Sequence, residues 1–88
     1  MTIYELADIM NTQIIITYFP NQKGRFIAEL EHYHIKEGNI IKGEFGTGKN
    51  PQEAIEDFVN IIKGKCLVTI TFDETMRKEF SVPMSLTS

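Results

Sequence analysis

The sequence has few of the residues that usually announce a disulfide-bonded, membrane or metal-binding protein. It contains one cysteine, Cys66, among 88 residues, which excludes an internal disulfide framework and a four-cysteine metal site. No apolar run approaches the roughly 20 residues of a membrane-spanning helix. The start, from Met1 to Glu5, lacks a basic region followed by an apolar block, so we expect no signal peptide. A single thiol fits a reducing compartment, and we expect a cytoplasmic location.

The chain also lacks an excess of positive charge. Nine Lys and Arg residues stand against twelve Asp and Glu residues, and the net charge is −3. A domain that binds duplex nucleic acid usually gathers basic side chains on one face, because neutralising phosphates supplies much of its affinity. The composition therefore disfavours nucleic-acid binding but leaves it as an alternative. The residues available for it are Lys23, Arg25, Lys42, Lys49 and Lys65.

What the chain does contain indicates one small globular domain. Its 42% apolar residues and its nine Phe and Tyr residues are typical of a chain that buries a core. The clearest local signal begins at Asn50, a favourable N-cap, with Pro51 at the first helical position and Glu53 at the third. We predict a helix from 51 to about 63, ended by Gly64.

Hydrophobic periodicity predicts the other elements. Thr2 and Glu5 form a capping-box pattern that begins a short helix, and Asn11 ends it. Strands are predicted at 13–19, 25–31, 40–45, 65–72 and 78–82, with a shorter extension at 33–36, turns at 20–24, 37–39, 46–48 and 73–76, and a loose tail at 83–88. The sequence therefore predicts a single α+β domain over 1–88, in the order α-β-β-β-α-β-β. Its main amphipathic helix packs on a mainly antiparallel sheet.

Alternation along the strands predicts which side chains are buried. In the second strand the core face carries Phe26, Ala28 and Leu30, and in the last strand it carries Phe80 and Val82. In 65–72 the predicted core face carries Cys66 and Val68. We therefore interpret Cys66 as a small core residue and not as a nucleophile.

The opposite face of the predicted sheet has apolar side chains of its own, which are Ile15, Ile27, Ile41 and Leu67. Two interpretations stay open. The face is an association surface, or it lies beneath the N-terminal helix. The apolar stripe of that helix consists of Ile3, Leu6, Ile9 and Met10. The strand at 14–19 also has too little charge to block edge pairing, so a homodimer through the sheet face or an edge strand is a further option.

No arrangement of residues indicates catalysis. Gly43 to Asn50 fits the spacing of a phosphate-binding loop until Asn50, which replaces the Ser or Thr that would hold magnesium. His32 and His34 would share a face of an extended segment and could both ligate a metal, but no fourth ligand stands at a recognisable spacing. A small metal-dependent enzyme is therefore the least favoured alternative. We expect no enzymatic activity, no resident metal and no cofactor.

Residues 13 to about 70 resemble the small domain of HicB-type antitoxins. The shared pattern is Gly-x-Gly-x-(Thr or Asn)-Pro-x-Glu-Ala before an amphipathic helix, and it occurs here from Gly46 to Ala54. The resemblance implies a core over 13–82 similar to HicB and to double-stranded-RNA-binding domains, with an additional N-terminal helix at 1–11. The chain departs from the family at 31–34, where a Pro-x-x-Pro-Gly-Cys-like segment is usual. No DNA-binding segment follows the core within the 88 residues.

The two ends of the chain are similar to those of small uncharacterised phage and prophage proteins, at Ile3 to Ala7 and at Glu79 to Pro83. This second likeness implies a phage or prophage origin and not an activity. With the HicB-like core and no catalytic arrangement, we expect a non-catalytic accessory protein that binds a protein partner, as an inhibitor or antitoxin-like factor. The residues expected to contact that partner are Ile27, Glu31, His32 and His34. No motif names the partner.

Overall fold

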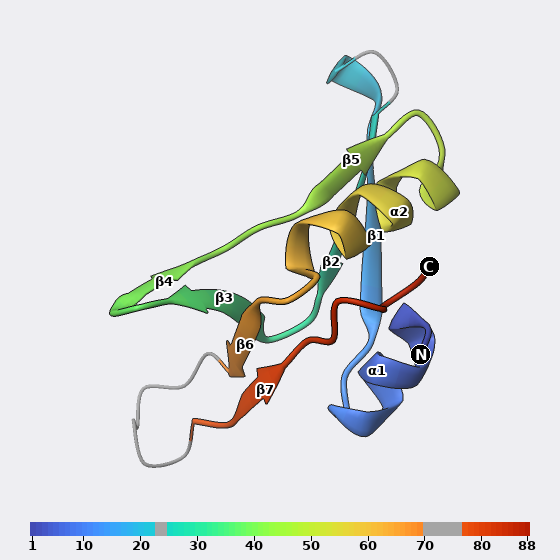
Figure 1. Ribbon diagram of the computed structural model, residues 1–88. Helices are drawn as coiled ribbons and strands as arrows, with labels where there is room; N and C mark the ends of the chain where they lie inside the picture. The colour runs from blue at the N-terminus through green and yellow to red at the C-terminus, as the bar shows by residue number, and fades with distance from the viewer. Residues whose placement is uncertain (23–24, 70–76) are drawn as a thin grey trace.

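The structure is a computed structural model that describes residues 1–22, 25–69 and 77–88 (Figure 1). Its helices are α1 (Ile3–Ile9) and α2 (Pro51–Ile62), with a short 3-10 turn, η1 (Pro20–Gln22). Its strands are β1 (Ile14–Phe19), β2 (Arg25–Leu30), β3 (Tyr33–Glu37), β4 (Ile40–Lys42), β5 (Gly46–Gly48), β6 (Cys66–Thr69) and β7 (Glu79–Ser81). The α+β class and the antiparallel pairing are confirmed, and the strands form two sheets.

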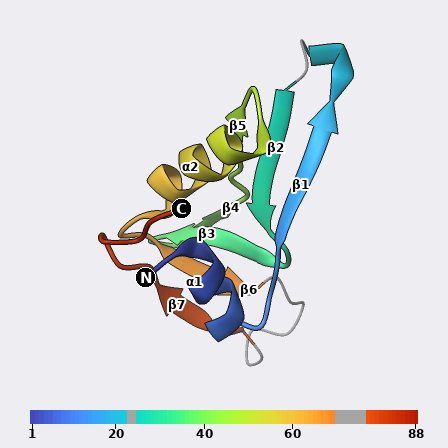
Figure 2. The same cartoon turned by 90° about the vertical axis from the view of Figure 1, so that its right-hand side faces the viewer.

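One bent hairpin runs through both sheets. β2 continues into β3, and after a turn at Gly38 and Asn39 the chain returns as β4 and then β5. The first sheet has the order β1-β2-β5, and the second has the order β4-β3-β6-β7. The bend falls at Glu31 and His32, where His32 has a φ of 65° (Figure 2). This left-handed residue resets the alternation, so that Leu30 before it and Tyr33 after it both pack toward the core.

One cluster of buried apolar side chains joins both helices to both sheets. It runs from Ile3 in α1 to Leu86 near the C-terminus. The members from α2 are Ala54, Ile55, Phe58, Val59 and Ile62, and those from the strands are Ala28, Leu30, Ile35 and Leu67. Because α1 and α2 pack into the same cluster, α1 does not cover the opposite side of the sheets (Figure 2). Of the two interpretations of that side, the one with α1 above it is wrong.

α2 begins as the sequence predicts and rests directly on the backbone of β5. Asn50 Oδ1 accepts a hydrogen bond from Glu53 N at 2.9 Å. A Cβ at Gly46 would lie 2.2 Å from the Ala54 carbonyl oxygen. Gly46–Gly48 is therefore a strand paired with β2 and not the predicted turn. The strand predicted at 40–45 likewise ends at Lys42. Glycine is usual in turns, but here its missing side chain lets a helix approach a strand.

α1 has the predicted capping box. Glu5 N donates to Thr2 Oγ1 at 3.2 Å, and Thr2 N donates to Glu5 Oε1 at 3.1 Å. The bond from the Thr2 backbone favours the ionised carboxylate and lowers the pKa of Glu5. Asn11, with a φ of 53°, ends the helix as predicted. The predicted apolar stripe is wrong at Ile9, which is 59% exposed. The buried stripe is Ile3, Leu6, Ala7 and Met10.

In the described part of the strand predicted at 65–72, up to Thr69, the predicted faces are wrong. Leu67 lies opposite Ile35 and Phe80 in the register and is 2% exposed, so it faces the core and not the other side. Cys66 lies on the opposite face and is half-buried. Val68 is buried but does not belong to the main cluster. Alternation alone could not fix the parity, because both faces of this strand carry apolar side chains.

The C-terminal segment is part of the core and not the predicted loose tail. Leu86 is fully buried, and Thr87 forms a parallel bridge with Thr2. Ile3 N donates to the Thr87 carbonyl oxygen at 2.7 Å, and Thr87 N donates to the Met1 carbonyl oxygen at 3.0 Å. These hydrogen bonds therefore hold the first residues of the chain against the C-terminal segment. Val82, predicted to point inward, is 3% exposed, which confirms the prediction.

Some predictions concern residues outside the described part of the chain. They are the turn at 73–76, the strand end at 70–72, and Lys23 and Gly24 in the first turn. In the described ranges, neither helix is long and apolar enough to cross a bilayer.

Candidate binding surface

The side of the first sheet that faces away from α2 carries an apolar strip. Gly46 lies under α2, and the strand register places Ala28 and Ile16 on the same side as Gly46. The alternate residues therefore point the other way. We call this side the outer face, and it consists of Ile15, Thr17, Phe19, Arg25, Ile27, Glu29 and Thr47. Ile15 and Ile27 are half-buried, and neither described helix lies above them.

The outer face ends in an open groove of about 370 Å³ at the bend between the two sheets. Apolar, acidic and imidazole groups share its walls, which include Ile15, Glu29, Glu31, His32, His34, Glu44 and Phe45. Phe45 is 49% exposed. Glu31 accepts from Gln13 Nε2 at 2.6 Å and lies 2.8 Å from His32 Nε2. Glu29 has no ion-pair partner within the described ranges. The groove therefore combines an exposed aromatic ring with carboxylates that can accept hydrogen bonds.

The structure brings three of the four expected partner-contact residues to this groove. Glu31 and His32 form its corner, and His34 enters from β3. A Cβ at Gly43 would lie 3.4 Å from His34 Nε2, so the imidazole lies against the Gly43 backbone. Ile27 lies outside the groove, farther along the outer face.

Sequence reasoning missed Glu29, Glu44 and Phe45 as groove residues. Residues 43 to 45 are not part of a strand, whereas the sequence predicted one continuous strand from 40 to 45. Gly43, which suggested a bulge, was the one local signal near Phe45. The groove itself depends on the angle between two sheets, which no local pattern encodes.

His32 occupies a backbone conformation that disfavours every residue with a Cβ. Its φ is 65°, and its side chain is 76% exposed. We expect His32→Gly to be more stable than His32→Ala by about 1 kcal/mol, because only the alanine retains the left-handed strain. Urea unfolding of both variants measures this difference. Equal stability of the two variants would show that residue 32 is not left-handed in solution.

The alternative of a metal site at His32 and His34 finds little geometric support. The left-handed backbone at His32 removes the extended geometry that placed His32 and His34 on one face. Within the described ranges, no group of three or more His, Cys, Asp or Glu residues is arranged to hold a metal ion.

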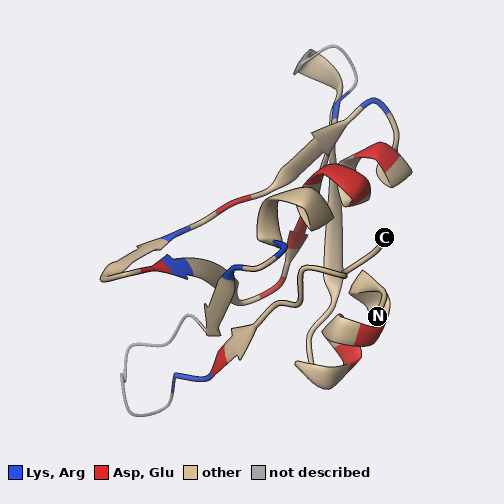
Figure 3. Ribbon diagram, viewed as in Figure 1, with Lys and Arg blue, Asp and Glu red and all other residues tan. Residues whose placement is uncertain are grey.

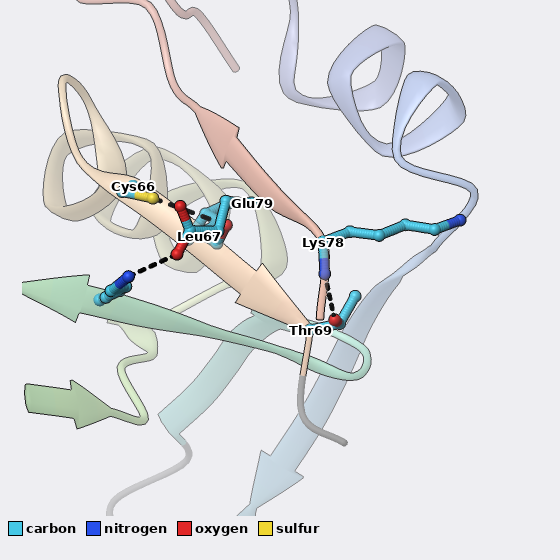
Figure 4. Close-up of polar contacts among 6 residues, drawn as sticks. Cys66, Leu67, Thr69, Lys78 and Glu79 are labelled. Atoms are coloured by element: carbon cyan, nitrogen blue, oxygen red, sulfur yellow. Dashed lines mark hydrogen bonds and ion pairs between the residues drawn. The ribbon is translucent and has the colours of Figure 1, made fainter. Parts of the chain in front are cut away.

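Cys66 Sγ lies 3.9 Å from the Leu67 carbonyl oxygen in β6 (Figure 4). At the other end of β6, the Thr69 hydroxyl accepts from Lys78 N at 2.8 Å (Figure 4).

Four of the five basic residues of the nucleic-acid alternative lie in the described part of the chain, and they fall into two groups at opposite ends of the bent hairpin (Figure 3). Lys23 lies outside the described residues. Arg25 and Lys49 adjoin the last paired residues of β2 and β5. Lys65 Nζ and Lys42 Nζ lie 2.7 Å and 3.4 Å from the Glu37 carboxylate at the other end. The hydrogen bond from Lys65, followed by that from Lys42, lowers the pKa of Glu37. The described basic residues therefore do not form one continuous stripe.

Comparison of the chain with protein-family models, with curated proteins and with solved structures found no match in any of the three.

Proposed function

We propose that this chain is a non-catalytic binding protein that engages a protein partner through the outer face and its groove. It would act as an inhibitor or antitoxin-like accessory factor of phage or prophage type. The supporting observation is that the apolar strip of Ile15 and Ile27 continues into a groove with Phe45 at its wall and carboxylates around it. Apolar side chains on a sheet face that no described helix covers, with a polar rim around them, are typical of an association site.

The composition of the groove favours a partner segment that is both basic and apolar. Glu29, Glu31 and Glu44 can accept charge-assisted hydrogen bonds from Lys or Arg. Phe45 offers an exposed ring that an aliphatic or aromatic side chain can cover. The HicB-like arrangement of a glycine strand, Pro51 and an amphipathic helix supports a fold of that family and, with it, a protein as the partner.

Panning a displayed library of short random peptides on the immobilised protein tests the proposal. We expect enriched peptides to combine Lys or Arg with aliphatic or aromatic residues. Calorimetry with a synthetic enriched peptide should show affinity reduced about tenfold or more by Phe45→Ser or Glu29→Gln, as expected for contacts at the centre of an interface. Tyr4→Ser is the matched control, because Tyr4 is 54% exposed on α1, away from the outer face.

Three results would contradict the proposal. The library yields no enriched peptide, the enriched peptides lack basic residues, or Phe45→Ser and Glu29→Gln bind as tightly as the Tyr4→Ser control. A parallel titration with duplex DNA and RNA at several salt concentrations tests the alternative. Binding that weakens steeply as salt rises, together with no peptide enrichment, would favour a nucleic-acid module instead.

A further inference from the structure

β1 is an edge strand, and one side of its backbone is open. It pairs with β2 alone. Glu31 N donates to the Gln13 carbonyl oxygen at 3.0 Å, so the backbone groups of residue 13 point toward β2. In antiparallel pairing this direction alternates, which turns the N–H and C=O of Ile14, Ile16 and Tyr18 away from β2. No described residue pairs with these groups, and β1 forms the outer margin of the sheet in Figure 2.

The other sheet edges carry features that discourage pairing with another chain. β4, β5 and β7 have three residues each. Lys42 lies in β4, and Glu79 lies in β7. On β5, Thr47 N donates to Asp57 Oδ2 at 2.9 Å, so an α2 carboxylate already occupies that edge. Short length, charge and covering are the usual protections of an edge strand. β1 has six residues, none of them charged, and so has none of these protections.

We propose that β1 pairs antiparallel with β1 of a second copy of this chain, so that two three-stranded sheets become one six-stranded sheet. The twofold axis passes through Ile16, which lies opposite Ile16 of the second copy. Ile14 of each copy then lies opposite Tyr18 of the other. Each of these pairs exchanges two main-chain hydrogen bonds, because all three residues direct their backbone groups outward.

The side chains beside this edge also favour pairing with β1 of a second copy. Ile16 is 38% exposed and Tyr18 is 52% exposed, on the side that carries α2. The Tyr18 ring packs in a tilted arrangement against Phe26, with ring centroids 4.8 Å apart, so it is already held in part over the sheet and needs little further ordering. In the twofold pairing Ile16 packs against Ile16 of the second copy, and Tyr18 packs against Ile14 of the second copy. Apolar and aromatic cross-strand pairs of this kind stabilise a sheet.

Electrostatic repulsion does not oppose the pairing of the two β1 strands. The charged residues nearest to it on the outer face are Arg25 and Glu29 of β2, one strand removed from the edge. In the twofold register, Glu29 lies in line with Ile15 and with Thr17 of the second copy, so the two Glu29 carboxylates lie on different rows. Because Ile14, Ile16 and Tyr18 share a side with α2, both copies of α2 lie on one side of the joined sheet. The outer face stays accessible in such a dimer, so the dimer does not depend on the proposed function.

Sedimentation velocity of the whole chain over a range of concentrations tests the proposal. We expect the mass to rise to twice that of one chain as concentration increases. Ile16→Lys places two like charges directly opposite each other and should weaken association about tenfold or more. Ile40→Lys is the matched control on the β4 edge, where Ile40 is 66% exposed, and it should dimerise as the unmodified chain does. Circular dichroism confirms that both variants are folded.

Residue-resolved amide exchange identifies the edge independently of any variant. The amides of Ile14, Ile16 and Tyr18 should exchange slowly at dimeric concentrations and rapidly after dilution. The amides of Ile15 and Thr17, already bonded to β2, should change little. The proposal is overturned if the chain is monomeric at all concentrations, if Ile16→Lys dimerises as readily as Ile40→Lys, or if the three outward amides exchange rapidly in the dimer.

Discussion

Gly46→Ala is expected to destabilise the protein by about 3 kcal/mol or more, which is a large share of the stability of a domain of this size. The added methyl group would lie 2.2 Å from the Ala54 carbonyl oxygen and 2.3 Å from Phe58 N. Both atoms belong to the α2 backbone, so no side-chain rotation relieves the overlap. The helix must move away from β5, and that movement opens the core around Ala54 and Phe58. Thermal unfolding should show a midpoint lower by about 10–20 °C.

Gly43→Ala is the control for the conformational effect of alanine in this hairpin. The atoms nearest to its methyl group would be those of the His34 ring, at 3.4 Å and beyond, and that ring can shift. We expect a change of about 0.5 kcal/mol or less. If Gly46→Ala were as stable as Gly43→Ala, the close approach of α2 to β5 would be wrong.

The helices were predictable from sequence because the signals at their ends are local. At the start of α2 the Asn50 side chain accepts from Glu53 N and Pro51 has no N–H to satisfy, whereas Thr2 and Glu5 cap α1 with a reciprocal pair of hydrogen bonds. Neither interaction requires knowledge of the rest of the fold. The β1–β2 hairpin was predictable for a related reason, since buried Ala28 and Leu30 flank the exposed Glu29 and η1 begins at Pro20 as β1 ends.

The errors arose where a distant segment decides the environment of a residue. Leu67 faces the core because β6 pairs with β3 in a register that places Leu67 opposite Ile35. Gly46 is a strand residue because α2 returns over it. The groove forms where two sheets meet at His32, and its walls come from β1, β2, β3 and the 43–45 segment. Periodicity within one segment contains none of this information.

Leu86→Ala is expected to destabilise the protein by about 2–5 kcal/mol, the cost of removing a large buried side chain from a core. A chain end is usually frayed, and the sequence predicted a loose tail here. Leu86 is instead 0% exposed and belongs to the main cluster. The backbone around it is fixed, because Thr87 bonds to Met1 and Ile3 and Leu86 N donates to the Pro83 carbonyl oxygen. The segment therefore cannot easily collapse into the cavity that the missing methyl groups leave.

Two measurements separate this core role from a merely local effect. Urea unfolding should give a lower midpoint for Leu86→Ala and no measurable change for Ser85→Ala, since Ser85 is exposed beside it. Amide exchange should become faster at Ile3 as well as at Thr87, because the bond between Ile3 N and the Thr87 carbonyl oxygen joins the two ends. If Leu86→Ala matched Ser85→Ala in stability, the C-terminal segment would be a loose tail. Contacts of that segment would then contribute nothing to holding α1 in place.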